Sequence, residues 1–164
     1  MPVLQRLRPD HAPAVLAFEA ANRTFFAASV PDRGDAFFAD YPPRHEALLA
    51  EQAAGTCHFH VLVAEDTGEV LGRFNLMDAA DGTAELGFRL AEKATGHGLA
   101  TAAVHDLFAL CRTTYGLTVL TARAAVRNTA SRAVLGRAGF VETGEEVELS
   151  GERGVGFVRV LGAA

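Results

Sequence analysis

The stretch LGFRLAEKATGHGLATAAV, residues 86–104, decides the fold of this chain. Its first residues alternate as in a strand, the segment at 95–100 is a turn of small residues, and apolar side chains from residue 99 onward follow a helical period. Gly96, Gly98 and Ala100 leave room for an anionic group beside the backbone amides, and the first amides of a helix lie at its positive end. We therefore predict a strand, a tight turn and a helix that together bind phosphate or diphosphate.

A simpler interpretation is that the glycines only permit the turn. Two known nucleotide sites do not fit. A mononucleotide P-loop needs Gly-Lys-Ser or Gly-Lys-Thr, whereas Gly98 is followed by Leu99 and Ala100. A Rossmann fingerprint belongs to the first strand–helix unit and has an acidic residue at the end of the next strand. Here a strand meander precedes the turn, and the next strand ends at Val126, so both sites are excluded.

The flanking sequence supplies the other elements of one domain, residues 1–164. Turns at Asp66-Thr67-Gly68 and Asp81-Gly82 join three antiparallel strands ahead of the glycine turn. Residues 22–43 hold several phenylalanines among turn formers and are expected to be irregular. The expected strands are 3–8, 57–65, 69–78, 83–91, 117–126, 140–149 and 154–161, and the expected helices are 10–21, 44–54, 98–114 and 128–139.

The order of these elements indicates the fold class. A meander of antiparallel strands is followed by a strand–helix–strand crossover, which joins parallel strands. We predict an α+β fold (α/β in looser usage) with a mixed, mostly antiparallel central sheet and helices on both faces.

Composition limits the classes of function. Of 164 residues, 49% are apolar and 21% are charged, which is typical of a globular domain rather than a disordered chain. The net charge of −5 gives no basic footprint for nucleic acid, and no apolar run approaches the roughly 20 residues that span a bilayer. The polar start, MPVLQRLRPD, argues against a secretory signal. We expect a cytoplasmic protein without nucleic-acid or membrane partners, and a homodimer is the general prior for a protein of this kind.

Metal ligation is suggested by Cys57, His58 and His60, but the sequence offers no third ligand at a suitable spacing. The two cysteines, Cys57 and Cys111, are too few for a disulfide framework. We expect neither a metal nor a disulfide.

Three segments in order carry a family resemblance: AELGFRL at 84–90, TGHGLATAAV at 95–104 and RNTASRAVLGRAGF at 127–140. Together they closely resemble the GNAT N-acetyltransferase superfamily, and within it the branch that contains ribosomal-protein-alanine acetyltransferases. The resemblance is strongest over residues 84–144. It implies the GNAT fold and an enzyme that transfers acetyl from acetyl-CoA, its co-substrate, to a primary amine.

The resemblance also implies how the cofactor binds. Backbone amides of residues 96–101 would hold the coenzyme A diphosphate, the strand at 88–90 would pair with the pantetheine arm, and one amide there would polarise the thioester carbonyl. The implied cofactor-binding residues are Phe88, Arg89, Leu90, Gly96, His97, Gly98, Leu99, Ala100, Thr101 and Asn128.

Thr95 departs from the family pattern, which has Arg or Gln at the start of this motif. Without that long side chain we expect weaker binding of the cofactor. His97 and Lys93 are the candidates to supply the missing charge.

Acetyl transfer needs a deprotonated amine, a polarised thioester and a protonated leaving thiolate. Ser131 matches a serine that the related enzymes place near the sulfur, which makes it the candidate proton donor. Glu148 lies close to a glutamate of the related enzymes and is the preferred general base, with Glu85 as its rival. The simpler interpretation of either glutamate is a solvated strand carboxylate, and of Ser131 a first-turn helix residue.

The expected acceptor is the α-amine of a protein or peptide, or a small amine. A catalytically silent acyl-CoA-binding or regulatory module is the rival in a different class, and Thr95 is the feature that favours it. Near the carboxy terminus, Glu145, Glu146, Glu148 and Glu152 form an acidic strip that either attracts a cationic amine or is simply solvated.

Overall fold

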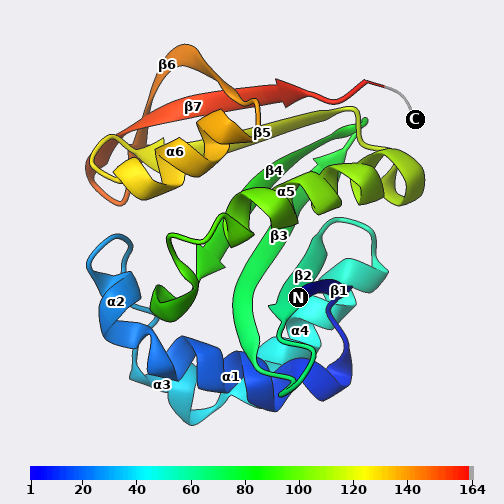
Figure 1. The fold of residues 1–164 in the computed structure, drawn as a ribbon, viewed down its shortest axis with the longest axis vertical. Coiled ribbons are helices and arrows are strands. Elements are labelled where there is room, and N and C mark those ends of the chain that lie inside the picture. Colours follow the sequence, from blue (N-terminus) through cyan, green and yellow to red (C-terminus); the bar gives the residue numbers. More distant parts are fainter. Residues whose placement is uncertain (163–164) are drawn as a thin grey trace.

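A computed structural model describes residues 1–162 and contains a single seven-stranded sheet in the order β1-β2-β3-β4-β5-β7-β6 (Figure 1). Every neighbouring pair is antiparallel except β4 and β5, which are parallel and are joined by the crossover through α5. The predicted mixed, mostly antiparallel sheet is therefore confirmed.

The strands are β1 (Val3–Arg6), β2 (His58–Val63), β3 (Val70–Ala80), β4 (Thr83–Leu90), β5 (Val119–Ala125), β6 (Val141–Leu149) and β7 (Glu152–Val160). The α-helices are α1 (Ala12–Ala21), α2 (Arg23–Ala27), α3 (Asp35–Ala39), α4 (Tyr41–Ala53), α5 (Leu99–Leu110) and α6 (Thr129–Arg137). Short helical turns are η1 (Pro9–His11), η2 (Glu92–Ala94) and η3 (Cys111–Tyr115), the last a π-helical turn that continues α5. No helix among residues 1–162 is both long and apolar enough to cross a membrane.

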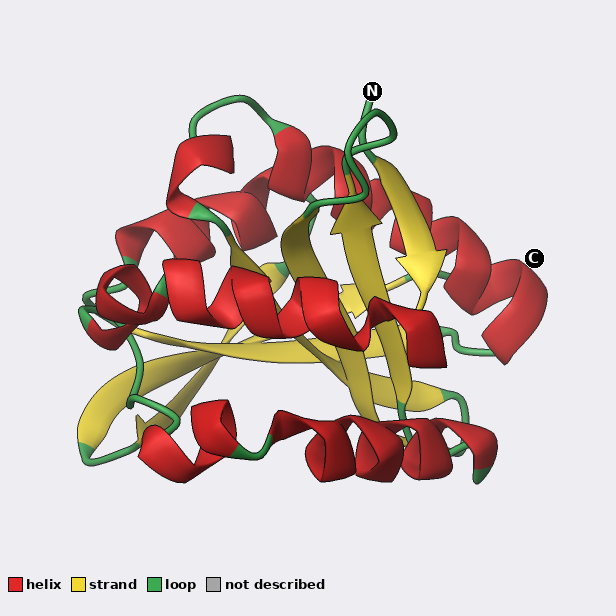
Figure 2. Cartoon of the chain, turned by 90° about the horizontal axis from the view of Figure 1, so that it is seen from below, coloured by secondary structure: helices red, strands yellow, loops and turns green. Residues whose placement is uncertain are grey.

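Helices cover both faces of the sheet, as predicted, and each face has its own core. Figure 2 shows the strands running through the middle of the molecule with helices above and below them. One core lies between the sheet and α5 and α6, with Phe74, Leu86, Leu107 and Leu135 at its centre. The other lies under α1–α4 and η2 and includes Phe59. Burial of these apolar surfaces is the main force that holds the helices to the sheet.

Residues 22–43 are not irregular, so that prediction was wrong. They form α2, α3 and the start of α4, which begins at Tyr41 rather than near residue 44. Phe26, Phe37 and Tyr41 are buried in the second core, and this long-range burial stabilises short helices whose local sequence does not favour them. Pro42 and Pro43 occupy the first turn of α4, where proline costs no hydrogen bond.

Candidate active site

Strands β4 and β5 separate after a short parallel contact, and the gap between them positions the site. Only Thr83, Ala84 and Glu85 of β4 pair with β5, whereas β4 continues to pair with β3 up to Leu90. From residue 86 onward, the edge of β4 that faces β5 has no strand partner within the described residues. Its backbone amides and carbonyls are therefore free to hydrogen-bond a ligand.

The glycine turn lies at the end of this edge. Gly96 and Gly98 have φ angles of 79° and 74°, in the left-handed region that glycine adopts without strain, and α5 begins directly after Gly98. A Cβ on either glycine would meet nothing within 4 Å, so the backbone conformation rather than crowding requires glycine here. The first amides of α5 precede the first intrahelical bond, from Ala102 to Gly98, and lie at the positive end of the helix.

Helix α6 faces this turn and begins with a side-chain cap. The backbone amide of Ser131 donates to Oδ1 of Asn128 at 3.2 Å. This bond fixes both residues at the start of α6.

Two cavities meet at these elements. The large cavity, about 710 Å³, is bounded by Phe88–Leu90 of β4, the glycine turn and the first residues of α5, one side of α6 and the end of α2. The small cavity, about 270 Å³, lies in the gap between β4 and β5 and is closed by the loop at 29–31 and by the β6–β7 hairpin. Residues shared by the two cavities are Ser29, Val30, Phe88, Asn128 and Ser131.

The turn is held against the first helices. The backbone amide of Glu92 donates to Oδ1 of Asn22 at 3.0 Å, which fixes η2 beside the junction of α1 and α2. Phe25 of α2 forms part of the wall of the large cavity.

A sequence comparison decides the family. Residues 3–141 match the model of the acetyltransferase (GNAT) domain. The chain belongs to the GNAT acetyltransferase family. Because the match covers most of the chain, the chain is an acetyl-CoA-dependent N-acetyltransferase that transfers acetyl to an amine.

Solved acetyltransferases share this fold. The ribosomal-protein-S5-alanine acetyltransferase of Vibrio fischeri superposes with a TM-score of 0.88 at 20% identity, over 96% of this chain and 91% of that one. Mycobacterium smegmatis RimJ, solved with CoA-disulfide, superposes with a TM-score of 0.83 at 26% identity. The match covers 96% of this chain and 80% of RimJ. The microcin C7 self-immunity acetyltransferase MccE, solved with acetyl-CoA and AMP, superposes with a TM-score of 0.83 at 17% identity. The match covers 96% of this chain and 92% of MccE. No significant match was found among curated sequences.

Most residues predicted to bind the cofactor line the large cavity of this GNAT domain. They are Phe88, Arg89, Leu90, Gly96, Gly98, Leu99, Ala100, Thr101 and Asn128. His97 is exposed and is not part of the cavity wall. Lys93 is bound to Glu69 at 2.5 Å, and the hydroxyl of Thr95 donates to the carbonyl of Glu92 at 2.7 Å.

The Arg89 side chain belongs to a buried ion cluster. Glu19, on α1, has an exposed side-chain fraction of only 1% and contacts Arg33 at 2.9 Å, Arg73 at 2.8 Å and Arg89 at 3.1 Å. Burial opposes the charge on Glu19, but the hydrogen bond from Arg33 and the charges of Arg73 and Arg89 outweigh it, so the pKa of Glu19 is lowered. Burial lowers the pKa of Arg89 to about 10.

The structure separates the three predicted catalytic residues. Ser131 lies where the two cavities meet, and Glu85 lines the small cavity. Glu148 is exposed and lines neither cavity. Its neighbour Leu149 lines the small cavity, and because side chains alternate along a strand, Glu148 points to the opposite face of β6.

Sequence reasoning missed several residues of the site. Ser29, Val30 and Pro31 line the small cavity but lie in the segment expected to be irregular. Glu152 was noted only as part of the acidic strip, yet it lines the small cavity, and Arg137 lines the large one. The one signal available for Arg137 was its place on α6, eight residues after Thr129 and on the same helical face.

Proposed function

We propose that this acetyltransferase holds acetyl-CoA in the large cavity and acetylates the α-amine of a protein or peptide that enters the small cavity. The observation that carries this proposal is the junction of the two cavities at Phe88, Asn128 and Ser131. A donor in one cavity and an acceptor in the other can react there without a covalent enzyme intermediate, because positioning removes much of the entropic barrier.

The large cavity fits the shape and chemistry of acetyl-CoA. One end carries the free amides of the glycine turn and α5, which suit a diphosphate. The unpaired edge of β4 runs from there toward the small cavity and offers amides and carbonyls to the two amide groups of a pantetheine arm. The acetyl end would then lie at the junction.

When bound, acetyl-CoA supplies a thioester whose carbonyl carbon is attacked by the amine. We assign Glu85 as the group that accepts the proton from the acceptor ammonium, directly or through water. A backbone amide within residues 88–90 donates to the thioester oxygen as it gains charge. The hydroxyl of Ser131 would give its proton to the sulfur as the C–S bond breaks, and it would regain a proton, directly or through water, from the nitrogen that has formed the C–N bond.

Two observations support a peptide acceptor. The wall of the small cavity includes the carboxylate of Glu85, which attracts an ammonium group. The structural neighbours include an enzyme that is named for the alanine of a ribosomal protein.

The test is a titration with acetyl-CoA, CoA and ATP, followed by thiol release with N-terminal peptides and small amines. We expect saturable binding of acetyl-CoA and CoA, indifference to ATP, and release only with an α-amine acceptor. Binding of ATP without CoA would contradict the proposal. Binding of acetyl-CoA with no turnover on any amine would instead favour the silent module.

A further inference from the structure

Arg127 joins three segments that lie far apart in the sequence. It lies two residues after the end of β5, and its Nε and Nη2 bind the carboxylate oxygens of Glu152 on β7, the latter at 2.9 Å. Its Nη1 donates to the carbonyl of Ala28 at 2.8 Å, and Nη2 donates to that of Ser29 at 3.4 Å. One guanidinium group therefore binds both the loop after α2 and the β6–β7 hairpin.

These two segments are opposite walls of the small cavity. The loop contributes Ser29, Val30 and Pro31, and the hairpin contributes Leu149, Ser150 and Glu152. Figure 1 shows the loop after α2 pointing toward the β6–β7 hairpin and the start of α6. Arg127 is not itself part of either cavity wall.

The loop is fixed at its other end by separate ion pairs. Arg33 binds the buried Glu19 at 2.9 Å, and Arg23 binds Asp32 at 2.8 Å. Residues 28–31 therefore lie between two anchors. Arg127 provides the anchor that connects the loop to the opposite wall of the cavity.

The effect of Arg127 is on position rather than on stability. The side chains of Arg127 and Glu152 are 52% and 40% exposed, and exposed ion pairs add little to the free energy of unfolding. A guanidinium group that makes several hydrogen bonds at once still restricts the distance between the segments it joins.

We propose that Arg127 is a positioning residue that fastens the two walls of the small cavity around the acceptor. The proposal rests on the function proposed above. Arg127 sets the affinity for the acceptor and the size of the side chain accepted next to the amine, and it does so without contacting the acceptor.

The test compares Arg127→Gln and Glu152→Gln with wild type. Arg127→Gln removes the bonds to both the loop and the hairpin, and Glu152→Gln removes the bonds that fix Arg127 to the hairpin. In either variant the two walls are no longer joined, so both should raise the KM for a peptide acceptor roughly three- to tenfold, with a smaller change in kcat. Both should also reduce the preference for a small first residue over a bulky one. The double variant should be no worse than Arg127→Gln alone, because Arg127→Gln already removes the contact with Glu152.

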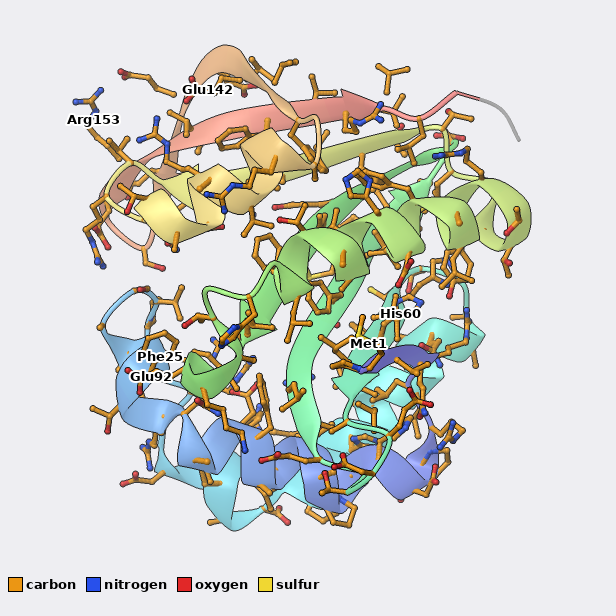
Figure 3. The ribbon with its side chains drawn as sticks, viewed as in Figure 1. Met1, Phe25, His60, Glu92, Glu142 and Arg153 are labelled. Carbon is orange, nitrogen blue, oxygen red and sulfur yellow. The ribbon has the colours of Figure 1, made fainter. Side chains whose placement is uncertain are left out.

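A direct contact between Glu152 and the acceptor would give a different pattern. Arg127→Gln would then free the Glu152 carboxylate and lower the KM, whereas Glu152→Gln would raise it. Opposite signs in the two variants therefore overturn the proposal. Arg153→Gln is the matched control, because Arg153 binds Glu146 on the same hairpin at 3.0 Å but lies at its outer edge (Figure 3).

A measurement independent of activity separates this proposal from the proposed function. Hydrogen–deuterium exchange of the segment 25–33 should be faster in Arg127→Gln and Glu152→Gln than in wild type, and unchanged in Arg153→Gln. Unchanged exchange in the first two overturns the role of Arg127 even if the enzyme acetylates peptides. If exchange is faster in these two variants but the wild-type enzyme acetylates no amine, the proposed function alone is contradicted and the fastening by Arg127 is supported.

Discussion

Glu85 accepts a hydrogen bond from Nε of Arg123 at 2.8 Å, across the two strands that separate to form the small cavity. The partner holds the Glu85 carboxylate at the cavity wall, whereas Glu148 points away on β6. Of the two glutamates proposed from the sequence, the geometry therefore favours Glu85 as the base.

Glu85→Gln should lower kcat/KM for the acceptor by roughly 100-fold or more, since a general base contributes at least this factor. Glu148→Gln should stay within about twofold of wild type, because it lines neither cavity. Steady-state thiol release with one peptide measures both variants. Equal loss in the two, or loss only in Glu148→Gln, would contradict the assignment.

Arg137 should compensate for Thr95 in binding the cofactor. Arg89 and Arg137 are the two cations in the wall of the large cavity, Arg89 is bound to Glu19, and Arg137 forms no ion pair within residues 1–162. Arg137→Gln should weaken CoA binding roughly tenfold or more, because a hydrogen bond to a charged group is lost. Titration with CoA, dephospho-CoA and pantetheine locates the contact.

A loss with CoA alone would assign Arg137 to the 3′-phosphate, and a loss with CoA and dephospho-CoA to the diphosphate. An equal loss with pantetheine would show that Arg137 contacts neither phosphate. Lys93→Gln is the control, because Lys93 is bound to Glu69 and is not part of the cavity wall.

Glu19 should be required for stability, because it is the carboxylate shared by Arg33, Arg73 and Arg89. Glu19→Gln leaves the buried guanidinium group of Arg73 and the half-buried one of Arg89 without a carboxylate partner and should lower the free energy of unfolding by about 3–5 kcal/mol. Asp35→Asn breaks an exposed ion pair with Arg23, whose 2.8 Å distance equals that between Glu19 and Arg73. This variant should change the free energy of unfolding by less than about 1 kcal/mol. Urea denaturation compares the two. A similar small loss in both would refute this role.

His60 should make stability depend on pH. Its Nδ1 donates to the carbonyl of Phe74 at 3.1 Å, so its Nε2 accepts a hydrogen bond from Tyr115 at 2.6 Å. Burial lowers its pKa from 6.5 to about 4, with smaller contributions from Arg6 and His58. Between these values the unfolded chain binds more protons than the folded one, so stability falls as pH decreases from 6.5 to 4.

The contribution of His60 over this window is about 3 kcal/mol at most. Denaturant titrations at several pH values should show a flatter profile for His60→Gln than for wild type. His97→Gln, at an exposed position, should keep the wild-type slope. An unchanged slope in His60→Gln would contradict the prediction.

Local signals explain which parts of the fold and the site were predictable. The alternation of β4, the glycines at 96 and 98 and the cap at Asn128 are properties of short segments, and each lies where the sequence placed it. The segment 22–43 was misread, because its helices depend on burial of Phe26 and Phe37 against distant strands.

The face of β6 could not be read from the sequence for a different reason. Between Glu142 and Glu146 the register of β6 against β7 shifts by two residues, so the residues of β6 that lie opposite a given residue of β7 cannot be counted along the sequence. Glu148 was chosen because it lies close to a glutamate of the related enzymes, but Leu149 and Glu152 are the residues of these two strands that line the cavity. The contact of Arg127 with Ala28 joins residues 99 apart and leaves no local pattern.

The most direct test of acetyl transfer to an α-amine uses a peptide with both a free amino terminus and an internal lysine. After incubation with acetyl-CoA and the enzyme, tandem mass spectrometry locates the acetyl group. We expect one acetyl group on the terminal nitrogen, and a much slower reaction with Glu85→Gln enzyme. Acetylation of the lysine alone, or an unmodified peptide across a panel of first residues, would contradict the account.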